Sequence, residues 1–153
     1  MTAETLKPGP YVLPAHEGRY IETLNLRILA DGQHTGDQML AAVMTNPVPG
    51  GPPLHTHHSH DELYYVLEGH YRFRVGEEEL EGGPGTFVYV PRGTPQTLAN
   101  VGPSAGRVFQ ITLPGFDGFV ERMAELPLEG SKRVGVEDLF RDYDTDQNGP
   151  PLL

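Results

Sequence analysis

The sequence predicts an all-β fold, a sandwich or barrel built from many short strands. Glycine and proline are frequent, with 19 and 15 residues in a chain of 153, and they separate short apolar runs instead of forming one tract. Several of these runs alternate apolar with polar residues, or are rich in β-branched and aromatic residues. This pattern is typical of strands joined by tight turns. The length suits one domain with a substantial buried core.

The first part of the chain is predicted to hold an irregular arm and two strands. The arm covers residues 1–19, which contain three prolines, and is expected to lie along the outside of a sheet. A strand is predicted over residues 20–29, followed by a polar turn over residues 30–36. Residues 37–45 are rich in Met, Leu and Ala, which favour helix, but the close Gly and Pro boundaries favour a second strand. The sequence NPVPGGPP at residues 46–53 excludes regular structure.

The middle and end of the chain continue this pattern. The alternation of Tyr71, Phe73 and Val75 with two arginines predicts a half-buried strand. Further strands are predicted at residues 55–57, 62–66, 86–90, 96–101 and 107–113, with a short one around Leu80. Apolar residues at helical spacing predict a short amphipathic helix over residues 116–125, and residues 136–143 form a second candidate. The tail from residue 144 is expected to be loosely ordered, with a turn at residues 144–149.

These elements divide the chain into three parts. Residues 1–19 are the arm, residues 20–115 form the barrel, and residues 116–153 form a C-terminal helical extension and tail. We find no internal repeat.

Composition excludes several classes of function. The 11 basic and 21 acidic residues leave a net charge of −10, which argues against nucleic acid and anionic membranes as partners. The absence of cysteine excludes disulfides and thiolate metal sites. No apolar run approaches a membrane span, and residues 1–18 lack the features of a signal peptide, so a cytoplasmic protein is expected.

The most informative stretch is residues 53–69, with the sequence PLHTHHSHDELYYVLEG. His55 and His57 are two residues apart and lie on the same side of a strand. Glu62 joins them on that side only if a bulge or turn interrupts the chain between His58 and Asp61. Two imidazoles and a carboxylate that converge are a set of ligands for a transition metal.

This stretch resembles the first motif of the cupin superfamily, with His55, His57, Glu62 and Gly69 at the motif spacing. The second cupin motif is matched by Gly85, by the run Pro91-Arg92-Gly93, and by Asn100. The chain is most similar to small single-domain cupins of the quercetin dioxygenase-like type, over about residues 22–120. The resemblance implies a cupin jelly-roll barrel, an all-β double-stranded β-helix with short C-terminal helices.

The resemblance also implies a metal site. Its ligands would be His55, His57 and Glu62, which bind one divalent metal ion (Fe, Mn, Ni, Co, Cu or Zn). The fourth family ligand is a histidine, and this sequence has Gln96 in its place. Gln96 could ligate weakly through its amide oxygen, hold a metal-bound water, or bind the substrate. In flavonol-cleaving relatives a glutamate at the position of Glu62 accepts the proton of the substrate hydroxyl, so Glu62 is also the candidate catalytic residue.

Other histidines have weaker claims to the site. His60 lies in the turn near Glu62 and is the best substitute for the missing ligand. His58 points away from the ligand side if the strand is regular. No spacing argument supports His16, His34 or His70, for which surface or hydrogen-bonded structural roles are expected.

The wall of a substrate pocket should come from inward-facing residues that flank the ligands. An aromatic and apolar cavity suits a flat, hydroxylated aromatic substrate, although each of these residues could equally be plain barrel core. The six candidates are Tyr64, Val66, Tyr71, Phe73, Leu98 and Phe109.

Three functions are compatible with this sequence. The first is a metal-dependent oxygenase, an oxidoreductase that acts on an aromatic hydroxylated small molecule of flavonol or polyketide type. The second is a non-oxidative metal cupin, a polyketide cyclase or isomerase in which the metal is a Lewis acid. The third is a metal-poor, non-enzymatic barrel that binds a small molecule, for which Gln96 is the argument. Fold alone does not choose among them. Cupins commonly pair through sheet edges and swapped N-terminal strands, so the resemblance also implies a homodimer.

Overall fold

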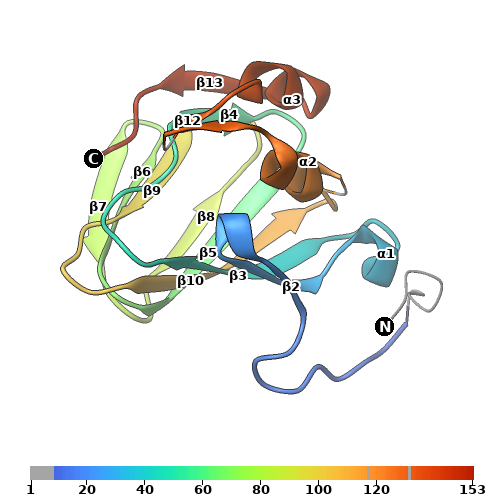
Figure 1. The fold of residues 1–153 in the computed structure, drawn as a ribbon. Helices are drawn as coiled ribbons and strands as arrows, with labels where there is room; N and C mark the ends of the chain where they lie inside the picture. Colours follow the sequence, from blue (N-terminus) through green and yellow to red (C-terminus); the bar gives the residue numbers. More distant parts are fainter. Residues whose placement is uncertain (1–8, 117, 131) are drawn as a thin grey trace.

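Two antiparallel sheets face each other and enclose the core of the molecule (Figure 1). This computed structural model describes residues 9–116, 118–130 and 132–153. Its strands dominate and its few helices are short. The predicted all-β fold class is therefore confirmed.

The larger sheet has six strands in the spatial order β1-β2-β3-β10-β5-β8. Neighbouring strands in this sheet run antiparallel. The strands are β1 (Arg19–Ile21), β2 (Leu26–Ala30), β3 (Leu40–Asn46), β10 (Gly106–Leu113), β5 (Asp61–Glu68) and β8 (Phe87–Val90).

The smaller sheet has five strands in the order β13-β4-β9-β6-β7. Both sheets contain strands that are distant in sequence, so the closed shape depends on long-range pairing. The strands are β13 (Thr145–Gly149), β4 (Leu54–His57), β9 (Gln96–Asn100), β6 (Tyr71–Val75) and β7 (Glu78–Gly82).

The main core lies between the two sheets and is formed by alternate residues of their strands. On β5 the side chains of Glu62, Tyr64 and Val66 are buried while their neighbours are more exposed, as the alternation predicts. A strand with this period turns one whole face inward, which carries Glu62 into the barrel with the apolar residues. The core cluster consists of Tyr64, Val66, Tyr71, Phe73, Val88, Val90, Leu98 and Val108.

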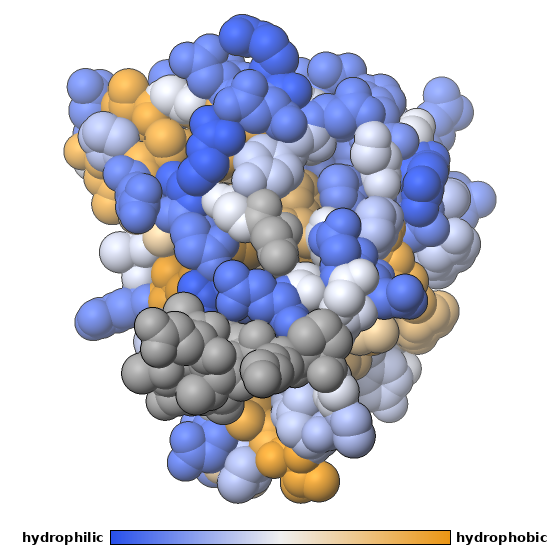
Figure 2. Space-filling view, turned by 90° about the vertical axis from the view of Figure 1, so that its right-hand side faces the viewer, coloured by the Kyte–Doolittle hydropathy of each residue, from blue (hydrophilic) through white to orange (hydrophobic). Residues whose placement is uncertain are grey.

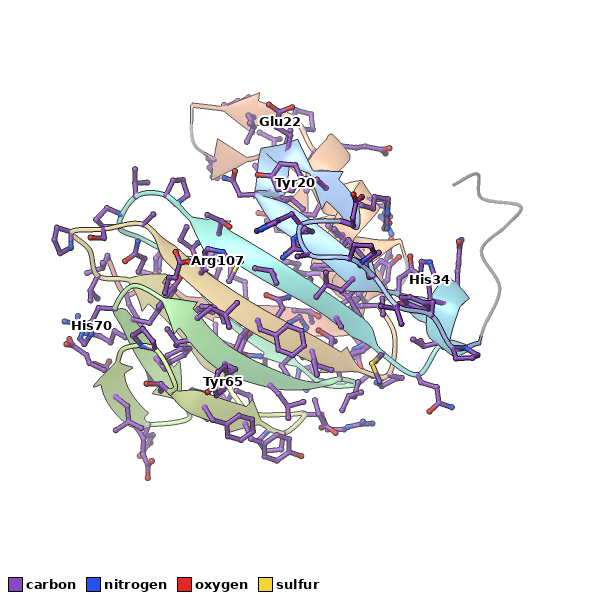
Figure 3. The ribbon with its side chains drawn as sticks, turned by 90° about the horizontal axis from the view of Figure 1, so that it is seen from below. Tyr20, Glu22, His34, Tyr65, His70 and Arg107 are labelled. Atoms are coloured by element: carbon purple, nitrogen blue, oxygen red, sulfur yellow. The ribbon has the colours of Figure 1, made fainter. Side chains whose placement is uncertain are left out.

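The opposite face of the larger sheet exposes aromatic residues (Figure 3). Tyr65 is 45% exposed and lies directly opposite Phe87, which is 59% exposed. On the other side of β5, Phe109 is the cross-strand partner of Tyr65. Figure 3 shows Tyr65 on this outer face, where β3, β10, β5 and β8 lie side by side.

The described part of the N-terminal arm contacts this outer face, as expected. Tyr11 donates a hydrogen bond from its hydroxyl to the carbonyl oxygen of Leu29, at 2.7 Å. Residues of the arm, together with β2, Ala41 and Phe109, line a groove of about 480 Å³. Residues 1–8 of the predicted arm lie outside the described residues.

The strand predicted over residues 20–29 is interrupted. A 3₁₀ turn, η2 (Glu22–Leu24), separates β1 from β2, and Asn25 then adopts a left-handed conformation with φ of 50°. Asn tolerates this region better than most residues, and its backbone N–H closes the turn on the carbonyl of Glu22 at 3.1 Å. The single-strand prediction was wrong because apolar alternation does not reveal such a turn. Further on, α1 (Gly32–Thr35) is one helical turn within the predicted polar turn.

In its described residues, the C-terminal extension contains the two predicted helices and three unpredicted strands. The helices are α2 (Phe119–Glu125) and α3 (Val136–Asp142), and a small hairpin of β11 (Leu128–Glu129) and β12 (Lys132–Arg133) lies between them in the chain. The segment predicted as a loose tail with a turn is instead β13, which pairs antiparallel with β4 at the edge of the smaller sheet. That prediction was wrong because the sequence TDQNG has no apolar alternation, and β4 supplies its partners.

The division at residue 116 consequently does not separate the barrel from the rest of the chain. In Figure 1, β13 lies beside β4, and α2 and α3 lie at the same end of the barrel. Figure 2 views the side of the molecule where α1 and α2 lie, and shows a largely hydrophilic surface with smaller apolar groups. Within the described residues, no helix is long and apolar enough to cross a membrane.

Candidate metal centre

Two buried histidines lie side by side on β4. His55 and His57 are separated by one residue, so both side chains project from the same face of the strand. Their ring centroids are 4.8 Å apart and the rings meet edge to face. The sequence prediction that these two histidines share a side therefore holds in the structure.

Glu62 reaches the histidines from the other sheet. The chain leaves the smaller sheet at the end of β4 and enters the larger sheet at the start of β5. This crossing is the interruption that the sequence required between His58 and Asp61. As a result, Glu62 Oε1 lies 2.9 Å from His57 Nε2, with both side chains buried.

Hydrogen bonds determine which ring nitrogen of each histidine carries a proton. His55 Nδ1 lies 2.9 Å from the carbonyl oxygen of Pro53, which only accepts, so Nδ1 must donate. His57 Nδ1 lies 2.8 Å from Thr145 Oγ1, and that hydroxyl donates its proton to the carbonyl of Tyr143. Thr145 can therefore only accept from His57. In both rings Nε2 is left as the nitrogen available to a ligand.

The second oxygen of Glu62 is held by Tyr64. The Tyr64 hydroxyl donates to Glu62 Oε2, and the phenol oxygen also lies 2.9 Å from the Gln96 amide at Oε1. A phenol has one proton, and an ionised carboxylate is the stronger acceptor, so Glu62 receives it. Since the phenol has no second proton, the contact between Tyr64 and Gln96 is a hydrogen bond when the amide turns its NH₂ group toward the phenol oxygen.

These contacts shift several pKa values. Burial by itself would raise the pKa of Glu62, but the charge of His57 and its hydrogen bond, the charge of His55 and the Tyr64 hydroxyl outweigh it and lower this pKa to about 2. Burial lowers the pKa of His55, and the neighbouring His57 lowers it further. Burial, the Glu62 charge and the hydrogen bond to Glu62 raise the pKa of Tyr64. At neutral pH the site thus combines an ionised carboxylate with a neutral His55, the forms in which these groups bind a cation.

A cavity of about 180 Å³ opens beside His57 and Glu62. Gln110 and Thr112 of β10 add polar groups to its wall, while the remaining wall is apolar. The apolar residues come from η2, β2, β3 and the C-terminal extension: Leu24, Leu26, Leu40, Met44, Phe116, Phe119, Val120 and Met123.

The predicted pocket residues do not line this cavity. Five of them belong to the packed core between the sheets, and Tyr64 alone among these contacts the site, through Glu62 and Gln96. The remaining residue, Phe109, lies on the opposite face of β10 from Gln110 and lines the outer groove beside the arm. Its predicted inward orientation was wrong because inward residues of β10 have even numbers, as buried Val108 and Thr112 show. The other four are Val66, Tyr71, Phe73 and Leu98.

Aromatic residues of the C-terminal extension cover the histidines. Phe116 meets the His57 ring edge to face at a centroid distance of 5.3 Å, and Phe119 lies 6.4 Å from the same ring. Phe140 of α3 lies 6.4 Å from the His55 ring. The apolar stripe at helical spacing in the sequence therefore faces the site. The sequence showed the apolar stripe, but it did not show that this stripe covers the two histidines.

The remaining histidines divide between surface and site. His58 points outward and pairs with Asp146 at 2.8 Å, as its position on a regular strand predicts. His60 is the spare histidine that the sequence singled out, and its ring lies 6.3 Å from that of His57 and stacks on Phe116 at 4.2 Å. Its Nε2 donates to the carbonyl of Gly115, and burial lowers its pKa. Its Nδ1 is buried and is the one such side-chain atom without a hydrogen-bond partner in the described residues.

The donor set fits a divalent metal in its chemistry. It offers two imidazole Nε2 atoms, one carboxylate, and a third imidazole nearby whose Nδ1 lacks a partner. The ligand atoms are not gathered around one point, and no group of three such side chains within residues 9–116, 118–130 and 132–153 is arranged to hold a metal ion. Instead, His57 and Glu62 bond to each other.

Known proteins with the same features identify the fold. The Cupin domain family, Cupin_2, matches residues 42–112, which run from β3 to β10 and include the four predicted ligand positions. Residues 42–112 thus match the cupin domain family, as the sequence motifs predict. Strand β13 and the helices α2 and α3 lie outside the matched residues.

Proteins with similar sequences include an enzyme. Over 70 residues the chain is 36% identical to uncharacterised protein MJ1618 of Methanocaldococcus jannaschii, which covers 46% of this chain. Over 126 residues, 79% of this chain, it is 29% identical to quercetin 2,3-dioxygenase of Bacillus subtilis. The chain spans only 56% and 36% of the length of these two curated relatives. Among solved structures, BH2720 of Bacillus halodurans has a TM-score of 0.58 at 23% identity, covering 71% of this chain and 84% of that one, which shows the shared fold.

Sequence reasoning missed the polar cavity residues Gln110 and Thr112, and it also missed Thr145. Thr145 is 4% exposed and holds His57 Nδ1, although it is 88 residues away along the chain. It lies in a polar segment with no strand pattern and outside the resemblance. No local signal in the sequence points to it.

Proposed function

We propose that this cupin domain is a metal-dependent oxygenase that acts on an apolar, hydroxylated aromatic small molecule. The observation that supports it is the fixed tautomer of His55 and His57, whose Nδ1 atoms both donate away from the site. Metal-binding histidines typically have their second ring nitrogen fixed in this way. The distant similarity to quercetin 2,3-dioxygenase supports the same class of reaction.

The proposed ligands are His55, His57 and Glu62. A divalent metal with two imidazoles and one carboxylate supplies a Lewis-acid or redox centre with positions open to O₂ and substrate. Glu62 binds in its ionised form, while Tyr64 holds its second oxygen and limits how the carboxylate turns. Gln96 supports Tyr64, so its amide acts on the site through the phenol.

The cavity determines which substrates fit. Its apolar wall, which includes Leu24, Met44, Phe119 and Met123, suits an aromatic ring system and excludes water around it. Gln110 and Thr112 can hydrogen-bond substrate hydroxyl or carbonyl groups. Glu62 on the same wall is the nearest carboxylate to accept a hydroxyl proton from such a substrate.

A second candidate is a small-molecule-binding barrel without a resident metal. Two observations favour it. His57 pairs directly with Glu62, and the amide of Gln96 contacts the Tyr64 hydroxyl. In this case the same apolar cavity would bind the ligand and the polar network would stabilise the barrel.

Elemental analysis of the purified protein, after exposure to each of Fe, Mn, Co, Ni, Cu and Zn, separates the two candidates. We expect about one metal per chain in the wild type, little in His57→Ala and Glu62→Gln, and wild-type content in His58→Ala, since the His58 side chain pairs with Asp146 on the surface. O₂ consumption with a panel of flavonols and simpler phenols then tests the reaction. Metal content without O₂ uptake on any compound that is turned over would exclude the oxygenase. Equal metal content in wild type and His57→Ala would favour the second candidate.

A further inference from the structure

Residues 144–148, which are Asp144 and the first four residues of β13, bond to four consecutive residues of the histidine segment. Thr56 bonds to Asn148, His57 to Thr145, His58 to Asp146 and Ser59 to Asp144. In each case the side chain from residues 144–148 reaches a side chain from residues 56–59. One short strand from outside the cupin match therefore holds the whole segment that carries the predicted ligand His57.

Only one of these bonds is buried at the site. Thr145 lies directly opposite His57 in the β13–β4 register, and both side chains are buried. The next residue, Asp146, bonds instead to the exposed ring of His58. Neighbouring residues of a strand point to opposite faces, so β13 acts on the site through Thr145 and on the surface through Asp146.

The direction of the proton in this contact is determined by a third group. Thr145 Oγ1 donates to the Tyr143 carbonyl at 3.1 Å, which cannot donate in return. Its lone pair faces His57 Nδ1 at 2.8 Å. His57 Nδ1 is therefore the donor in this contact, and Nε2 is the ring nitrogen that faces Glu62.

We propose that Thr145 is a positioning residue for the metal site, which sets the tautomer of His57 and so makes Nε2 a metal ligand. The part of this inference that concerns metal binding rests on the proposed function. The part that concerns the tautomer of His57 does not. Without the hydroxyl, the neutral ring gains most by placing its proton on Nε2, where Glu62 accepts it. A proton on Nε2 excludes a cation from that nitrogen.

The variants Thr145→Val and Thr145→Ser test this proposal. Valine has nearly the same shape as threonine but cannot accept a hydrogen bond, whereas serine keeps the hydroxyl. We expect Thr145→Val to weaken Co²⁺ binding about 10–100-fold, as is typical when the partner of a ligand histidine is lost. Thr145→Ser should stay close to the wild type. Asp146→Asn is the matched control, since it changes the adjacent residue of β13 on the outer face, and its Co²⁺ affinity should equal that of the wild type.

Long-range ¹H–¹⁵N NMR of the metal-free protein provides the second readout. We expect the Nδ1 proton of His57 to be hydrogen-bonded and protected from solvent exchange in the wild type and in Thr145→Ser, and this protected Nδ1 proton to be absent in Thr145→Val. Urea unfolding of each variant separates loss of fold from loss of positioning. If Thr145→Val does not fold, Thr145→Ala removes the same hydroxyl with a smaller side chain and serves in its place.

The outcomes distinguish this proposal from the proposed function. Weakened Co²⁺ binding together with a changed tautomer in Thr145→Val, both restored in Thr145→Ser, supports the positioning role. An unchanged tautomer, or unchanged Co²⁺ affinity in a folded Thr145→Val protein, overturns it. If the wild type itself binds no Co²⁺ or other metal, the proposed function fails, and the NMR comparison alone still decides whether Thr145 positions His57.

Discussion

Gln96 lies directly opposite His55 in the pairing of β9 with β4, and its side chain is only 2% exposed. Its amide lies 2.9 Å from the hydroxyl oxygen of Tyr64. Tyr64 in turn donates to Glu62, which bonds to His57. The residue that replaces the family's fourth histidine is therefore part of a hydrogen-bonded chain that ends at two of the predicted ligands.

Gln96→His should increase metal affinity. The imidazole would stand beside His55 and add a stronger donor than an amide, so we expect Ni²⁺ or Co²⁺ to bind about tenfold more tightly. Isothermal titration of the metal-free protein measures this. Equal affinity in Gln96→His and the wild type would show that position 96 is not within reach of the metal.

Tyr64→Phe should destabilise the protein. The change removes one hydroxyl and leaves an oxygen of buried Glu62 and the amide of Gln96 without this partner. Loss of such a bond to a buried charged group costs about 1–3 kcal/mol. Urea denaturation measures the free energy of unfolding. Tyr65→Phe, on the exposed face of the same strand, should change it by less than about 0.5 kcal/mol. Similar values for the two variants would contradict the network.

Phe73→Ala tests the assignment of the predicted pocket residues to the core. Phe73 is buried and packs near Tyr64 and Tyr71, with ring centroids about 6 Å apart. Truncating a buried phenylalanine leaves a cavity and costs about 3–5 kcal/mol. Phe87→Ala removes the same ring from the surface and should cost much less. A small change in unfolding free energy for Phe73→Ala would place its ring in an open pocket instead.

Gly51→Ala should be strongly destabilising. A methyl group on Gly51 would lie 1.8 Å from the carbonyl oxygen of Leu98 in β9, so the loop before β4 or the strand itself must move. We expect a loss of about 3 kcal/mol or more in thermal or urea unfolding. Gly36→Ala is the control: its φ of 63° also disfavours alanine, but no atom lies within 4 Å of the added methyl. It should cost only about 1 kcal/mol.

Tyr65→Glu tests the oligomeric state. The family resemblance implies a homodimer paired through sheet edges. Phe87 lies on β8, an edge strand of the larger sheet, so we expect the dimer to bury the exposed aromatic residues Phe87 and Tyr65 there. In that case light scattering should give twice the monomer mass for the wild type. A charge at position 65 should shift the protein to the monomer, because a buried unpaired carboxylate is costly. A wild type that is monomeric at all concentrations, or a dimer unaffected by this change, would show that this face is not the interface.

The local sequence pattern was sufficient to predict side-chain direction where a single strand or helix determines it. The period of two in residues 62–66 places Glu62 on the inner face of β5, and the two-residue spacing of His55 and His57 places them on one face of β4. The helical stripe of Phe119, Val120 and Met123 predicted α2. In each case the side-chain direction follows from the geometry of a single strand or helix.

Pattern was insufficient where a distant partner decides the outcome. Strand β13 is polar and is stabilised by its bonds to residues 56–59, which no local period reveals. The apolar side chain of Phe109 predicts an inward orientation. However, the outer face of β10 is also apolar, so apolar character alone does not tell which face Phe109 occupies. The turn at Asn25 divided a run that alternated well enough to predict one strand.

By itself, the sequence determined the all-β class, the strand that carries His55 and His57, and the residue types of a metal site, since residue identity and spacing set these directly. Only the tertiary structure decided how those residues meet. The crossing from one sheet to the other places Glu62 against His57, and β13 brings Thr145 from 88 residues away to hold its other nitrogen. Hydrogen-bond donors and acceptors act over about 3 Å, so proton positions in this site follow from packing that the linear sequence does not encode locally.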